Sequence, residues 1–290
     1  MNMKQGILLT AIGHPYYGRL AYNLAVTIKA VEDFPIAILT DGHAMAHLDD
    51  KRRSIFNEII QLAIEGGNFQ KANEVRLNFP KYTPFKETLA LDVDMAWLSK
   101  KPSEVFRLLE ERDFTAVNEG YLELDSWEDH TSGKYSFWAD PEGLKTAYGL
   151  TGRLYQFRGE FILFRKTAAV QKLYKTALQI FYKPKVQTLF HGETVTDEFC
   201  LNVATNLCGI EPHEDQWQPT YWPGKRGNLI PPMLELRNQY YGLSAGGNGA
   251  PPQLKKTYNL LIEAAYYKMG LRHPYPLQAK RNYLTERIKS

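Results

Sequence analysis

The sequence predicts an α/β protein with a mostly parallel, Rossmann-like central sheet flanked by helices, followed by a loop-rich and helical C-terminal extension. Three observations predict this class. A strand–helix–strand pattern opens the chain, an apolar run interrupted by Asp-Val-Asp spans residues 88–98, and the composition changes after Ile210. Alternating strands and helices are typical of parallel sheets covered on both faces. We therefore expect one α/β domain over residues 1–210 and an extension over 211–290, packed on that domain or continuing it.

The N-terminal segment has the pattern of a βαβ unit. Residues 6–12 and 35–42 are continuous apolar runs of the kind found in central parallel strands. Residues 14–18 predict a turn, and residues 20–31 carry apolar side chains at helical spacing. The connection between the two strands should be right-handed.

Further elements follow along the chain. Strands are expected at 56–62, 114–117 and 156–165, and helices at 102–112 (with Ser103 as a possible cap), 167–182, 197–208 and 254–269. Residues 71–78 are expected to form either a helix or an irregular segment. Thr196 and Gly209 are residue types that begin and end helices, so both ends of the helix at 197–208 are marked. Residues 119–150 show no periodicity and predict a loop, whereas residues 244–249 predict a flexible hinge in preference to a phosphate-binding loop.

The run at residues 88–98 carries two carboxylates, Asp92 and Asp94, with Val93 between them. Side chains alternate along a strand, so both aspartates should project to one side while Val93 points into the core. Open α/β sheets bind ligands at the C-terminal ends of their strands. Two close carboxylates repel each other unless a positive charge lies between them, and Mg²⁺ or Mn²⁺ bridging to phosphate oxygens is the usual solution. The pattern therefore predicts a cation and phosphate site, against the alternative of a strand end emerging into solvent.

Charge is unevenly distributed along the chain. The net charge is +3, but residues 251–290 contain eight Lys or Arg against Glu263 and Glu286, a local charge of +6, so the other 250 residues sum to −3. A basic end on a mildly acidic body predicts a polyanionic partner such as nucleic acid, an anionic membrane face or a charged glycan.

The cellular context can also be predicted. No stretch approaches 18 consecutive apolar residues, and residues 1–5 resemble neither a signal peptide nor a membrane anchor. Cys200 and Cys208 are expected to be free thiols of a reducing compartment. Together these features predict a cytoplasmic protein.

In the order and spacing of these features, the sequence resembles the nucleotide-sugar glycosyltransferases of the GT-A fold and, more loosely, the retaining family-8 enzymes. The stretch from Tyr82 to Asp94 is similar to the segment that precedes and contains the Asp-x-Asp (DXD) motif of those enzymes. Residues 157–166 resemble their Phe-Asn-Ser-Gly strand, although Arg158-Gly159-Glu160 replaces Asn-Ser-Gly. Residues 196–202 are similar to the acidic helix start that faces the donor sugar.

The resemblance implies transfer of a sugar from a nucleoside-diphosphate sugar, most commonly a uridine diphosphate (UDP) sugar, to a hydroxyl acceptor. By position, Asp94 would bind Mn²⁺ or Mg²⁺, and Asp92 the metal or the donor ribose. Donor contacts would come from Thr10, Ala11, Ile12, Tyr17 (stacking on the base), Asp41, Lys86 and Lys225. Asp197 or Glu198 would lie near the anomeric carbon, and His213 would be a third metal ligand. Simpler interpretations remain open: Lys86 as a solvated lysine, the two acids as helix-capping residues and His213 as an ordinary histidine.

Two other functions compete with this one. A nucleotidyltransferase also uses Asp-bearing strands, but it usually begins with a Gly-rich basic loop that residues 6–18 lack. A non-catalytic nucleic-acid-binding protein would use residues 251–290 and their tyrosines, Tyr258, Tyr266, Tyr267, Tyr275 and Tyr283. The acceptor is also open among lipid-linked or surface glycans, proteins and modified DNA bases.

Overall fold

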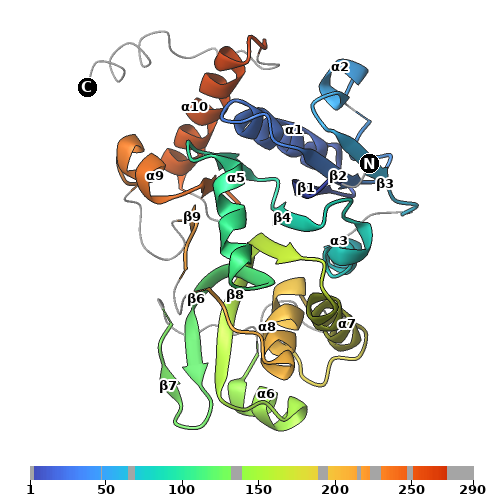
Figure 1. Ribbon diagram of the computed structural model, residues 1–290, viewed down its shortest axis with the longest axis vertical. Helices are drawn as coiled ribbons and strands as arrows, with labels where there is room; N and C mark the ends of the chain where they lie inside the picture. Colours follow the sequence, from blue (N-terminus) through green and yellow to red (C-terminus); the bar gives the residue numbers. More distant parts are fainter. Residues whose placement is uncertain are drawn as a thin grey trace.

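The computed structural model describes residues 3–46, 48–64, 69–131, 139–188, 195–213, 217–222, 230–246 and 251–272. Its central sheet has seven strands in the order β3-β2-β1-β4-β8-β6-β7 (Figure 1). The strands are β1 (Gln5–Ala11), β2 (Ile36–Thr40), β3 (Glu58–Gln61), β4 (Glu87–Leu91), β6 (Phe114–Glu123), β7 (Glu128–Asp129) and β8 (Arg153–Arg165). β1 to β4 are mutually parallel, whereas β8 is antiparallel to both of its neighbours. The predicted α/β class with a mostly parallel sheet is confirmed.

Helices cover both faces of this sheet. They are α1 (Pro15–Lys29), α2 (Asp50–Arg53), α3 (Phe69–Arg76), α4 (Phe79–Tyr82), α5 (Pro102–Val105) with the 3-10 turn η1 (Phe106–Glu110), α6 (Pro141–Tyr148), α7 (Ala168–Tyr182), α8 (Asp197–Cys208), α9 (Met233–Gln239) and α10 (Pro252–Lys268). Figure 1 shows α1 beside α10 and α7 beside α8. Among the described helices, none combines the length and the apolar character needed to cross a membrane.

The alternation of apolar side chains along β1 explains the layering. Ile7 and Leu9 pack into a core with α1 and α10, while Leu8 packs into a second core with α7 and α8. A strand buried on both faces needs apolar residues at every position, which is why its sequence is a continuous apolar run.

The run at residues 88–98 forms two strands. β4 ends at Leu91, the segment Asp92–Asp94 turns, and β5 (Met95–Trp97) joins a separate three-stranded sheet in the order β5-β10-β9. The prediction of one continuous strand is therefore wrong, and side-chain alternation does not determine where the aspartates point. Val93 is buried in the core, as expected.

The small sheet joins the C-terminal segment to the rest of the protein. β10 (Gly242–Ser244) pairs with β5 and with β9 (Thr220–Tyr221), and α10 packs on α1 and β5. The boundary at residue 210 stays a prediction, but the described part of the extension packs directly on the first 210 residues.

Three local predictions are wrong for identifiable reasons. Residues 15–18 are the first turn of α1, because Pro15 is tolerated at the first helical position and His14 Nδ1 accepts a hydrogen bond from the Tyr16 amide. The supposed loop at 119–150 contains the rest of β6, then β7 and α6. Ser103 is not a cap, since its hydroxyl donates to Glu32 at 2.9 Å.

The link between α1 and the small sheet can be tested at Thr27. Its buried hydroxyl donates to Leu24 O and accepts the Trp97 amide at 2.9 Å. Thr27→Val should leave that amide unpaired and cost about 1–3 kcal/mol of unfolding free energy, measured by denaturant titration. Thr205 is a matched control, because its buried hydroxyl only donates to Asn202 O in its own helix. Equal losses in Thr27→Val and Thr205→Val would contradict this account.

Candidate functional site

The Asp92–Asp94 turn lies where the two sheets meet. The Asp92 amide donates to Glu160 O on β8 at 3.0 Å, which ties this end of the turn to the central sheet. Asp94 O accepts the Ala245 amide at 3.0 Å, just beyond β10. Gly246 packs on the Asp94 carboxylate so closely that a Cβ there would lie 2.1 Å from Oδ2. The aspartates are thus held from both sides by backbone.

Arg76, at the end of α3, supplies a positive charge that the sequence analysis missed. Its guanidinium forms an ion pair with Asp92, donates from Nε to Asp197 Oδ2 at 2.6 Å, and donates from Nη2 to Gly159 O at 2.6 Å. Arg76 therefore links three chain segments that are far apart in sequence. Nothing in its local pattern distinguishes it from a basic residue in the last turn of an ordinary helix.

Helix α8 delivers Asp197 and Glu198 to this cluster. Thr196 caps the helix by accepting the Phe199 amide at 3.1 Å, so both acids lie in the first turn, as predicted. The side chain of Asp197 is buried, and Glu198 Oε1 accepts the Gly159 amide at 2.8 Å. The two acids therefore face β8.

An irregularity in the central sheet makes room for these contacts. The pairing of β6 with β8 shifts register after Ala116 and again after Asn118. Beside this shift, α8 side chains replace strand neighbours: Glu198 binds the Gly159 amide, and Asn202 binds both backbone groups of Phe157. Gly159 itself must lack a side chain, since a Cβ would lie 2.4 Å from Arg76 Nη2.

The neighbours of Gly159 on β8 form a second group of contacts. Arg158 pairs with Glu160 at 3.0 Å and with Glu119 at 3.5 Å, and Thr220 on β9 donates to Glu160 at 2.5 Å. Arg158 and Glu160 stand where the Phe-Asn-Ser-Gly strand of the family-8 enzymes, which this segment resembles, has Asn and Gly. The structure brings both of them to the edge of the candidate site.

Burial and mutual repulsion perturb the carboxylates. Burial raises the pKa of Asp92 to about 7, opposed by Arg76 and reinforced by Asp94 and Asp197. Burial and Glu160 raise the pKa of Asp94. Burial and Asp197 raise the pKa of Glu198 to about 8, although the Gly159 hydrogen bond acts against this. The cluster thus holds more negative charge than Arg76 balances.

Residues predicted to contact a donor lie beside this cluster with unequal access. Thr10 is the penultimate residue of β1, and its buried hydroxyl has no hydrogen-bond partner in the described part of the chain. The side chains of Ala11 and Ile12 are buried in the two cores, so only their backbone can face a ligand. Tyr17 is 45% exposed. Asp41 is buried and accepts the amides of Gly13 at 2.8 Å and Ala44 at 2.7 Å, so its carboxylate positions the loops after β1 and β2.

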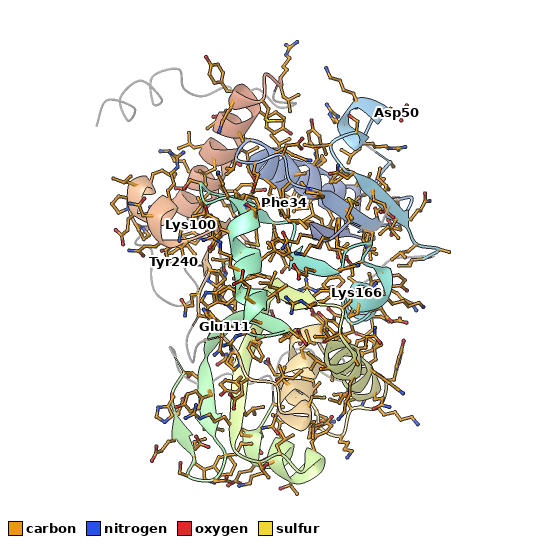
Figure 2. All side chains as sticks on the ribbon, in the orientation of Figure 1. Phe34, Asp50, Lys100, Glu111, Lys166 and Tyr240 are labelled. Atoms are coloured by element: carbon orange, nitrogen blue, oxygen red, sulfur yellow. The ribbon has the colours of Figure 1, made fainter. Side chains whose placement is uncertain are left out.

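Two predicted site residues, Lys86 and His213, are not brought to the cluster, and a third lies outside the described residues. Lys86 precedes β4 at the opposite end from Asp92, where its carbonyl accepts the amide of Lys166 (labelled in Figure 2). The five residues of β4 separate it from the aspartates by about 17–20 Å. The His213 amide donates to Thr115 Oγ1, in the early part of β6, and its ring packs against Trp217. Lys225 lies outside the described residues.

A third protein ligand for a metal is not assembled. Within the described ranges, no group of three or more His, Cys, Asp or Glu side chains is arranged to hold a metal ion. The predicted set Asp92, Asp94 and His213 therefore does not come together, because His213 binds beside Thr115 instead.

Comparison with known structures identifies the architecture. The chain is similar to the bifunctional glycosyltransferase WbbM in its apo form, with a TM-score of 0.60 and 11% identity over 93% of this chain and 51% of WbbM. The chain therefore spans about half the length of WbbM. It also matches the galactosyltransferase LgtC in complex with donor and acceptor sugar analogs, with a TM-score of 0.52 and 12% identity over 89% of this chain and 95% of LgtC.

A second LgtC structure, an active-site mutant, matches with a TM-score of 0.51 and 13% identity over the same shares of both chains. The chain has the GT-A glycosyltransferase fold. The likeness to family-8 enzymes is loosely consistent with the LgtC match. No protein-family model and no curated protein sequence matches the chain, so the GT-A fold is recognised through its structure.

Arg76 should be essential for the stability of this GT-A protein. Arg76→Gln leaves the buried Asp197 and the partly exposed Asp92 without their counter-charge, which should cost about 3–5 kcal/mol near pH 8. The loss should shrink near pH 5, because the raised pKa of Asp92, about 7, leaves that carboxyl protonated there; denaturant unfolding at both pH values measures it. Arg165 is a matched control, because it pairs with Glu87 and Asp113 at the other end of the sheet and is 36% exposed. Arg165→Gln should cost under about 1 kcal/mol, and a similar loss in both variants would refute the special role of Arg76.

The raised pKa values also predict how stability varies with pH. A carboxyl with a pKa of about 8 in the folded state, as for Glu198, binds a proton more tightly there than when unfolded. Its stabilising effect is complete below about pH 4 and disappears as pH rises through about 8. Glu198→Gln should therefore flatten the fall in melting temperature between pH 5 and pH 8. The exposed Glu58→Gln serves as control, and parallel curves for wild type and Glu198→Gln would disprove the assignment.

Proposed function

We propose that this protein is a divalent-cation-dependent glycosyltransferase that moves a sugar from a nucleoside-diphosphate sugar to a hydroxyl acceptor. The observation that supports it most directly is the joining of Asp92, at the C-terminal end of β4, through Arg76 to Asp197 at the start of α8. In an open α/β sheet this edge is where ligands bind. The donor and acceptor sugar analogs bound by LgtC agree with this class of reaction.

The residues present fit a hard cation bound together with a diphosphate. Mg²⁺ and similar ions are often held by one or two carboxylates, with phosphate oxygens and water completing the shell, so a third protein ligand is not required. Burial first, and neighbouring carboxylates second, raise the pKa of Asp92 and of Asp94, and a bound cation would stabilise the charged forms of both. Asp94 would bind it directly, and Asp92 would bind the ion or the donor ribose. We propose Mn²⁺ or Mg²⁺.

The end of β1 supports a nucleotide next to the aspartates. The unpaired Thr10 hydroxyl and the backbone of Ala11 and Ile12 would line the nucleotide site, and the exposed ring of Tyr17 would stack on the base. We propose a UDP-sugar donor. Asp41 would support this site indirectly through the Gly13 amide.

The chemistry follows from charge. Cleavage of the bond between sugar and diphosphate concentrates negative charge on the departing nucleotide, which the bound cation stabilises. The sugar carbon becomes positively charged in the transition state and is stabilised by a nearby carboxylate. Asp197 and Glu198 are the candidates, with Arg76 and the Gly159 amide holding them in place. With a pKa near 8, Glu198 is largely protonated at neutral pH, so the candidate for the charged carboxylate is Asp197, which forms an ion pair with Arg76.

Acceptor binding by the C-terminal extension stays a prediction, and fewer of its tyrosines are available for it than the sequence suggests. Tyr258 and Tyr266 are buried in the core with α1, so neither can stack on a nucleic acid, whereas Tyr267 is 89% exposed. Residues 273–290, with four of the eight basic residues of the segment 251–290, lie outside the described ranges. A polyanionic acceptor such as modified DNA or a surface glycan, and a cytoplasmic location, remain predictions.

The proposal is tested by asking whether donor binding depends on Asp94. Wild-type protein should gain several degrees of melting temperature with a UDP-sugar plus Mn²⁺, and less with either alone, because bound ligands stabilise the folded state. Asp94→Asn should lose this combined shift and reduce sugar transfer at least a hundredfold, while keeping its own fold. Asp113→Asn, a control on an ion pair remote from the site, should keep both. Full transfer by Asp94→Asn would overturn the proposal.

A further inference from the structure

Trp222 is a partly exposed aromatic ring held against a buried cation. The guanidinium carbon of Arg158 lies 4.9 Å from the centroid of the Trp222 ring. The Arg158 side chain is only 11% exposed, whereas Trp222 is 37% exposed. A cation packed over an indole ring is attracted to its electron-rich face, which holds the ring in one orientation. The remaining surface of the ring is available to a ligand.

Ion pairs and hydrogen bonds hold both Arg158 and the segment that precedes Trp222. Arg158 is held by Glu119 at 3.5 Å and by Glu160 at 3.0 Å, and Glu160 is in turn bound by the hydroxyl of Thr220, two residues before Trp222. Asn118 and Trp217 exchange two backbone hydrogen bonds at 2.8 and 3.0 Å, which fix the segment that leads to β9. We refer to Trp222 and Arg158 as the Trp222 platform.

The Trp222 platform borders the proposed reaction centre. Arg158 and Glu160 flank Gly159, whose amide binds Glu198 and whose carbonyl binds Arg76. Side chains alternate along a strand, so Arg158 and Glu160 project to the other face of β8 from the one that α8 covers. The Asp92 amide donates to Glu160 O at 3.0 Å, so Glu160 lies directly beside the proposed cation site.

The charge around this region selects the kind of acceptor. Apart from Glu198, which is largely protonated at neutral pH, five carboxylates meet two guanidinium groups there: Asp92, Asp94, Glu119, Glu160 and Asp197 against Arg76 and Arg158. The diphosphate of a donor adds further negative charge. A polyanion entering beside the donor would be repelled, whereas an uncharged sugar would not. A sugar ring also presents a face of C–H groups that can pack on an indole ring. Its hydroxyl groups can donate hydrogen bonds to carboxylates.

We propose that the Trp222 platform binds the acceptor, that the acceptor group entering the site is an uncharged sugar ring, and that Trp222 stacks on it. This inference rests on the proposed glycosyltransferase function, but it concerns binding and can be measured without turnover. It assigns a role to Arg158 and Glu160, the residues by which this chain departs from the strand it resembles.

The test is equilibrium binding of neutral disaccharides to the full chain, with UDP and Mn²⁺ present, measured by saturation-transfer NMR. A single-stranded DNA oligonucleotide serves as the anionic probe. We expect saturable binding of at least one neutral disaccharide, weakened about tenfold or more in Trp222→Ala and within about threefold of wild type in Trp222→Phe. Trp127 is a matched control, since it is 42% exposed and packs on Lys145 near the β6–β7 turn. Trp127→Phe should bind as wild type does.

The outcomes separate this inference from the proposed function. Asp94→Asn should stop sugar transfer and keep disaccharide binding. A loss of catalysis can therefore be distinguished from a loss of acceptor binding at the Trp222 platform. The inference is overturned if no neutral disaccharide binds, if Trp222→Ala binds as tightly as wild type, or if Trp222→Ala weakens only the DNA oligonucleotide.

Discussion

The buried guanidinium of Arg76 is the constraint on which the site depends. It lies among carboxylates from β4 and α8 and also binds a β8 carbonyl, so three elements distant in sequence are positioned by one side chain. A planar cation with several fixed donors can satisfy such a set, whereas a lysine could not reach all three partners in this geometry. Burial raises the pKa values of Asp92, Asp94 and Glu198, and the opposing effect of Arg76 does not restore them to their ordinary range.

The irregular pairing of β6 and β8 is the second constraint. A regular ladder would satisfy the backbone of β8 from its neighbour strand and keep α8 side chains out. The register shift instead leaves Gly159 without a partner residue on β6, and α8 supplies Glu198 to the Gly159 amide and Asn202 to the backbone of nearby Phe157. Sheet irregularities often occur beside active sites because they redirect side chains locally. Here one segment of β8 contacts α8 on one face and contributes Arg158 to the Trp222 platform on the other.

Much of the framework was predictable because it depends on local patterns. The run at residues 6–12, the capped helix from Asp197 to Cys208 and the position of Asp92 at a strand end all follow from periodicity, capping residues and strand polarity. The turn assigned to residues 14–18 failed because proline begins helices as readily as it forms turns. The prediction of a single strand over residues 88–98 failed because both halves are equally apolar, and only their different pairing partners show that they are two strands.

The sequence by itself determined the strand–helix–strand start of the chain, the carboxylate pair after β4 and the acidic start of α8, since each depends on residues close together in the chain. Tertiary structure alone decided that Arg76 pairs with those acids, that Lys86 and His213 lie elsewhere, and that Arg158 meets Trp222. The physical reason is that charge pairing and aromatic packing depend on distances in space. Those distances are set by strand order and register, which no local pattern of residues specifies.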